Sequence, residues 1–166
     1  MEINNLEMIS FRNHRKTNID FDPGLTIIWG ENGSGKTSIL EAIHSLSYGK
    51  SFRTNNKKDL IKKGSDFFFI KGSFKNTENF NNTVSLSQDI KGNKKIQIDN
   101  KVIKKRKDLF GLNNVVVFSP EEEGITKGTP LFRRNYFDRI FSICSYEYLS
   151  SLLLYNKTIK QRNSIL

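Results

Sequence analysis

A short glycine-rich segment, Gly30 to Thr37, constrains the fold of this 166-residue chain more than any other feature. It directly follows a continuous apolar run, Leu25 to Trp29, which is typical of a strand covered on both faces. Behind it, apolar residues recur at helical spacing until Gly49, and these residues are Ile39, Leu40, Ala42, Ile43 and Leu46. The order predicts a strand in the centre of a sheet, a tight loop and a helix, which is an α/β arrangement.

The segment itself, Gly-Glu-Asn-Gly-Ser-Gly-Lys-Thr, has the spacing of a phosphate-binding loop, or Walker A motif. Its glycines let several backbone N–H groups converge on phosphate oxygens without Cβ clashes. Lys36 is predicted to contact the β- and γ-phosphates, Thr37 to bind Mg²⁺ through its hydroxyl, and Ser38 to bond an α-phosphate oxygen. The sequence therefore predicts a P-loop NTPase whose nucleotide contacts are Gly30, Glu31, Asn32, Gly33, Ser34, Gly35, Lys36, Thr37 and Ser38.

The segments around the loop are predicted to be largely β-structure as far as residue 105. Residues 3–11 and 17–21 predict a half-solvated hairpin at the start of the sheet, because apolar and polar residues alternate there. Further on, short strands separated by turn residues predict an antiparallel lobe packed beside the nucleotide-binding sheet. These strands are expected at residues 67–74, 84–88, 95–98 and 101–103, with turns at 91–93 and 99–100.

The C-terminal third is predicted to be helical after one more strand. The apolar run Val115–Phe118 indicates that strand, and Ser119-Pro120 and then Thr129-Pro130 each provide a helix cap followed by proline. The last helix, from Tyr146, contains no residue that would terminate it. We expect a single domain, with the P-loop sheet at 1–50 and 110–130, the antiparallel lobe at about 65–105 and helices at 130–166.

The balance of charge favours polyanionic partners. The chain has 27 Lys and Arg residues against 17 Asp and Glu, a formal charge of +10. The basic residues lack interleaved aromatics, so they suit contacts with a phosphate backbone better than base stacking, although a merely solvated face is the alternative for each cluster. The clusters are Lys57-Lys58, Lys62-Lys63, Lys91, Lys94-Lys95 and Lys104-Lys105-Arg106-Lys107.

Several other classes of protein find no support in the sequence. Cys144 is the only cysteine, so no internal disulfide can form; its apolar neighbours predict a buried thiol, and a reducing cytoplasm fits. The N-terminus has no signal-peptide pattern, and no apolar run is long enough to cross a membrane. His14 and His44 are isolated, so we expect ordinary histidines there and no metal centre built on histidine or cysteine.

Several segments spread along the chain are distinctive. They are Phe11-Arg12-Asn13, the loop with residues 38–43, Gly49-Lys50-Ser51-Phe52-Arg53-Thr54, Phe118-Ser119-Pro120-Glu121, residues 133–138, Tyr155-Asn156-Lys157 and residues 160–163. These segments, and their order over nearly the whole chain, resemble the RecF family of bacterial recombination mediators, whose ATPase head belongs with the SMC-type ABC ATPases.

The resemblance implies an ATP-dependent DNA-binding protein of replication, recombinational gap repair and the SOS response. Such proteins bind ATP and Mg²⁺ between two heads of a homodimer and bind DNA at junctions of single and double strands. They act with other recombination mediator proteins in the cytoplasm, not at a membrane. The resemblance also implies nucleotide contacts for Arg12 and Asn13 and places Glu121 near the γ-phosphate and metal, although the glutamine usual in ABC ATPases is absent there.

Two motifs that an ABC-type head needs for hydrolysis do not occur in these 166 residues. One is an apolar strand ending in Asp with a following Glu, and the other is a Ser-Gly-rich signature segment. We therefore interpret the sequence as the N-terminal part of a longer protein, with its catalytic acids unidentified. The alternatives are another SMC-like or transporter ATPase, or a small phosphotransferase with Arg133-Arg134 as its lid.

Overall fold

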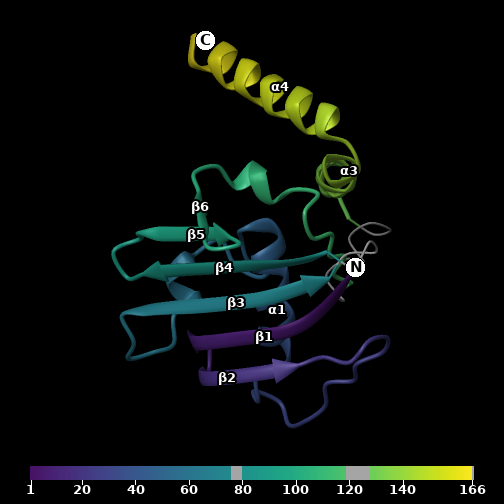
Figure 1. Ribbon diagram of the computed structural model, residues 1–166. Coiled ribbons are helices and arrows are strands. Elements are labelled where there is room, and N and C mark those ends of the chain that lie inside the picture. Colours follow the sequence, from purple (N-terminus) through teal and green to yellow (C-terminus); the bar gives the residue numbers. More distant parts are fainter. Residues whose placement is uncertain (76–79, 119–127, 166) are drawn as a thin grey trace. The chain divides into compact units, whose positions relative to one another are not determined.

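The computed structural model describes residues 1–75, 80–118 and 128–165. The chain forms two compact units, Met1–Val115 and Val116–Leu166. Figure 1 shows the first unit as a twisted sheet with helix α1 against one face. Its elements are β1 (Glu2–Phe11), β2 (His14–Asp20), α1 (Lys36–Tyr48), η1 (Lys57–Leu60), β3 (Phe67–Lys75), β4 (Asn81–Asp89), β5 (Lys94–Ile98), β6 (Lys101–Ile103) and η2 (Arg106–Leu109).

The six strands form one sheet in the order β2-β1-β3-β4-β5-β6, and every pairing is antiparallel. The predicted strands of the antiparallel lobe are confirmed, as is the turn at Asp99-Asn100, where both residues have positive φ. The antiparallel lobe was expected to pack beside the nucleotide-binding sheet, but β1 pairs with β3 along most of its length, so the N-terminal hairpin and the lobe form one sheet. Among the described strands the sheet is antiparallel, not mixed.

Helix α1 covers one face of this sheet, and the hydrophobic core lies between the helix and the sheet. The predicted stop is confirmed: Gly49 adopts a left-handed φ of 64° and its N–H bonds the carbonyl of Ser45 at 2.8 Å. Close approach of helix and sheet depends on Gly72 in β3, where a Cβ would lie 2.8 Å from Leu46 Cδ1. The fully buried apolar side chains are Leu6, Met8, Phe11, Ala42, Leu46, Phe68, Ile70, Phe74 and Val84.

The two apolar runs predicted as strands are not strands here. Residues 25–30 and 115–118 have no regular secondary structure and no strand partner among the described residues, and their side chains are largely solvent-exposed. Leu25 and Trp29 are each 87% exposed, and Phe118 is 91% exposed. The prediction assumed neighbouring strands, and an apolar sequence alone cannot supply the hydrogen bonds that define a strand.

The described part of the second unit contains two helices, α3 (Pro130–Cys144) and α4 (Tyr146–Ile165). The predicted cap is confirmed, because the Thr129 hydroxyl accepts a bond from the N–H of Phe132 and Pro130 occupies the first turn. Cys144 is exposed, contrary to the prediction, because it lies at the end of α3 in a unit with little interior. None of the described helices is long and apolar enough to span a membrane.

Candidate nucleotide-binding site

The loop from Gly30 to Thr37 leads directly into the first turn of α1, as predicted. Gly33 and Gly35 have φ values of 83° and 104°, which L-residues with a side chain rarely adopt. The Lys36 ammonium donates to the carbonyl oxygens of Gly30 at 2.8 Å and Glu31 at 2.7 Å. The loop is therefore closed around its own lysine at a helix N-terminus, the end of a helix that attracts anions.

A cavity of about 610 Å³ opens beside the loop. This volume lies within the range of pockets that hold small-molecule ligands. Its lining is rich in cations and hydroxyl groups, which suits a polyphosphate with a bound metal. The lining residues are Arg12, Asn13, Asn32, Gly33, Gly35, Lys36, Thr37, Ser38, Arg53, Asp59, Ile61, Lys62 and Lys63.

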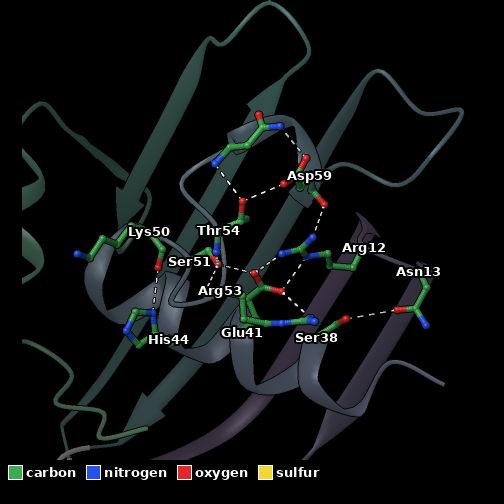
Figure 2. Close-up of polar contacts among 11 residues, drawn as sticks. Arg12, Asn13, Ser38, Glu41, His44, Lys50, Ser51, Arg53, Thr54 and Asp59 are labelled. Carbon is green, nitrogen blue, oxygen red and sulfur yellow. Dashed lines mark hydrogen bonds and ion pairs between the residues drawn. The ribbon is translucent and has the colours of Figure 1, made fainter. Parts of the chain in front are cut away.

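A fully buried carboxylate, Glu41 of α1, organises one wall of this cavity (Figure 2). Arg12 donates to it through Nε at 2.8 Å and Nη2 at 2.6 Å, a bidentate pair. The Ser51 hydroxyl donates to Glu41 Oε1, and Arg53 Nη1 lies 3.7 Å from Oε2. These four side chains, here called the Glu41 cluster, connect the turn after β1, helix α1 and the segment after α1.

The two arginines of the Glu41 cluster differ in what their guanidinium groups contact. Arg12 also donates through Nη1 to the carbonyl of Asp59 at 2.8 Å, so each of its three nitrogens bonds to protein. The Arg53 side chain is 46% exposed, and its guanidinium meets Glu41 through the longer ion pair of 3.7 Å. Arg53 is therefore better placed than Arg12 to extend toward a ligand in the cavity.

The predicted nucleotide-contacting residues are brought together in part. Of the loop, Asn32, Gly33, Gly35, Lys36, Thr37 and Ser38 line the cavity, as do Arg12 and Asn13. Gly30 and Glu31 contribute the carbonyls that hold Lys36. Ser34 lies in the same loop, where its N–H donates to Glu31 O at 3.2 Å. Glu121, together with Ser119 and Pro120, lies outside the described residues.

Sequence reasoning did not find the role of Glu41, Ser51 or Asp59. Glu41 lies on the buried face of α1 among apolar and small residues. A carboxylate at such a position needs a cationic partner, which is the signal that could have revealed the cluster. Its partners are distant in the sequence, so the sequence alone does not identify them.

Two of the predicted basic clusters contain lysines that are already bonded within the protein. Lys62 Nζ donates to Asn13 O at 2.7 Å, and Lys94 Nζ donates to Gly49 O. Lys62 and Lys63 also line the cavity. The side chains of Lys57, Arg106 and Lys107 lie outside the described part of the chain.

A closed Gly-rich loop at a helix N-terminus, with its lysine and hydroxyl residues facing a cationic cavity, defines a P-loop nucleotide-binding domain. The chain belongs to the family described as an AAA domain, whose model matches residues 5–164.

Curated relatives identify which members of this class the chain resembles. The DNA replication and repair protein RecF of Clostridioides difficile (strain 630) is 38% identical over 167 residues, covering 100% of this chain and 44% of the relative. RecF of Clostridium novyi (strain NT) is also 38% identical, and the match covers 100% of this chain and 46% of that relative. The resemblance to RecF is thereby confirmed, and the chain spans less than half the length of these relatives.

Solved structures confirm the predicted fold class. A structure of the recombination mediator protein RecF with ATP, in the RecFOR pathway, superposes with a TM-score of 0.91 at 33% identity, covering 98% of this chain and 44% of that one. A structure from a study of ATP-driven dimerization and DNA-stimulated activation of SMC ATPases superposes with a TM-score of 0.66 at 24% identity. This match covers 83% of the present chain and 98% of the other. The second likeness shows the fold alone, an ABC/SMC-type head.

Proposed function

We propose that this chain is the ATP- and Mg²⁺-binding part of a RecF-like ATPase of DNA replication and recombinational repair. The observation that supports it best is the loop closed on Lys36 at the head of α1, next to a cavity lined by cations and hydroxyls. Thr37 would hold the metal, and Lys36 with the backbone N–H groups would hold the β- and γ-phosphates. Bound Mg²⁺ would neutralise phosphate charge.

The longer protein would hydrolyse ATP slowly as a homodimer in which two heads enclose the nucleotide. The catalytic acids would then come from outside these 166 residues, since the sequence contains no apolar strand ending in Asp-Glu. In the cytoplasm it would bind DNA at junctions of single and double strands, together with other recombination mediators, during gap repair and the SOS response. Likeness to RecF over the whole chain supports this assignment.

Residues 1–166 should bind ATP with Mg²⁺ but hydrolyse it no faster than a buffer blank. Binding requires only the loop and α1, whereas turnover requires a positioned water and an acid to activate it. Equilibrium titration with a fluorescent ATP analogue measures the first property, and a phosphate-release assay measures the second. Normal turnover that disappears in Lys36→Ala would contradict the division of roles, and a lack of ATP binding would contradict the proposed function itself.

DNA binding should depend steeply on salt and little on base sequence. About four phosphate contacts by Lys and Arg predict a loss of affinity of roughly a hundredfold between 50 and 200 mM salt, because binding releases counterions from DNA. Fluorescence anisotropy with a labelled junction, and with the same junction of scrambled sequence, provides the measurement. An affinity that does not change with salt would exclude backbone contacts as the source of binding.

A further inference from the structure

The turn between β1 and β2 lies directly against the phosphate loop. We call Arg12 and Asn13 of this turn, together with His14 at the start of β2, the hairpin tip. Phe11 pairs with His14 at the end of the two strands, and Arg12 has a φ of 55°. The backbone of the tip is fixed from the other side as well. The Arg12 N–H donates to Leu60 O at 2.8 Å. The hairpin tip is therefore a fixed platform beside the loop.

Two consecutive side chains of the hairpin tip bond to loop carbonyls. Asn13 Nδ2 donates to Gly33 O at 2.8 Å, and His14 Nε2 lies 3.2 Å from Gly35 O. A carbonyl oxygen only accepts, so Nε2 carries the proton in this contact. In the neutral ring Nδ1 then accepts from the Thr17 hydroxyl, which is 3.0 Å away. The Gly35 carbonyl thus selects the tautomer of the imidazole, and the bond to Thr17 holds the orientation of the ring.

These bonds control the direction of peptide groups in the loop. In a trans peptide the C=O and the N–H point in opposite directions. Gly35 O accepts from His14 and also from the N–H of Ser38 at 2.9 Å, so the N–H of Lys36 points away from the helix, toward the loop interior. The Gly33 carbonyl is held by Asn13 in the same way, while the N–H of the same peptide group bonds Glu31 O.

The fit between hairpin tip and loop leaves no space at Gly35. A Cβ there would lie 2.4 Å from His14 Nε2 and 2.8 Å from Asn13 Oδ1. The Ser38 hydroxyl, in the first turn of α1, also lies 3.4 Å from Asn13 Oδ1. Asn13 and His14 therefore contact the loop at two carbonyls and the helix at one hydroxyl.

We propose that Asn13 and His14 are positioning residues of the nucleotide site. They hold the carbonyls of Gly33 and Gly35 so that the loop keeps its shape and presents the N–H and the ammonium of Lys36 to phosphate, without themselves touching the nucleotide. This inference rests on the proposed function. It also gives Asn13 a role that differs from the direct nucleotide contact expected from the sequence.

The test compares ATP with inorganic tripolyphosphate, which has neither base nor sugar, by calorimetric titration of the 166-residue chain. Asn13→Ala and His14→Ala should each weaken both ligands about threefold to tenfold, because each removes one hydrogen bond that holds the loop. His14→Gln places an amide donor near the position of Nε2, and it should bind within about twofold of the unchanged chain. Asn18→Ala, in the same hairpin but outside the cavity, is the matched control and should leave both affinities unchanged.

The outcomes separate the two proposals. If the unchanged chain binds neither ligand, the proposed function fails. If it binds both and the variants lose affinity for ATP alone, Asn13 and His14 contact the base or ribose, and the positioning role is overturned. Unchanged affinity of both alanine variants for both ligands also overturns it. If His14→Ala does not fold by circular dichroism, Asn13→Ala and His14→Phe provide the same comparison.

Discussion

Replacing Lys36 with alanine should weaken ATP binding at least about a hundredfold. The carbonyls of Gly30 and Glu31 hold the ammonium at the loop, and in the proposed function this group meets the β- and γ-phosphates. Its loss removes two or more charge-assisted hydrogen bonds, each contributing about 1.5–3 kcal/mol, and leaves those carbonyls without their donor. Titration with a fluorescent ATP analogue measures the change in Kd.

The control for this substitution is Lys101→Ala. Lys101 is an exposed lysine at the start of β6 and does not line the cavity, so its replacement makes the same change in net charge away from the site. Lys101→Ala should bind ATP within about twofold of the unchanged chain, because an exposed distant charge is screened by salt. If both variants lose affinity equally, general electrostatic attraction and not the loop accounts for binding.

Glu41→Gln should destabilise the first unit by about 3–5 kcal/mol. The substitution conserves volume but removes the buried charge that Arg12 and Arg53 contact, and it leaves the partly buried guanidinium of Arg12 without its partner. Since Arg12 also fixes the hairpin tip, the loss extends to the wall of the cavity. In a chain of this length the melting temperature should fall by roughly ten degrees, which circular dichroism or calorimetry records.

Glu2→Gln makes the same chemical change at an exposed position of β1 and should leave the melting temperature within about one degree. A double variant, Arg12→Met with Glu41→Leu, distinguishes the contribution of the ion pair to stability from that of side-chain packing. It should recover part of the stability that Glu41→Gln loses, because apolar residues of similar size often replace a buried pair at little cost. A melting temperature of Glu41→Gln equal to that of the unchanged chain would show that the Glu41 cluster contributes nothing to stability.

Local sequence signals predicted much of the fold. The end of α1 at Gly49, the strands β3 to β6 and the cap at Thr129 depend on residues a few positions apart, and the structure has all three. The run Leu25–Trp29 shows the limit of such signals. Its apolar character predicts burial, but strand formation depends on neighbouring strands, which no local pattern provides.

In the candidate site, too, the sequence predicted the local features and missed the contacts between distant residues. The phosphate loop could be predicted because spacing within eight residues determines its chemistry. The contacts that support the loop could not, because Asn13 meets Gly33, and Arg12 meets Glu41, only after the hairpin folds against α1. His14 illustrates the consequence: in the sequence it is an isolated histidine, and in the structure it bonds to the loop.

Tyr48, the last residue of α1, bonds the chain at the end of the first unit. Tyr48 donates its hydroxyl to Val115 O at 2.6 Å and accepts from the N–H of the same residue at 3.1 Å. It thus satisfies both backbone groups of the last residue before the second unit, as a neighbouring strand would. Mechanical tension on the chain beyond Val115 would pull on α1 through this side chain. The helix that begins at the phosphate loop is thereby tied, at its other end, to the point where the chain leaves the unit.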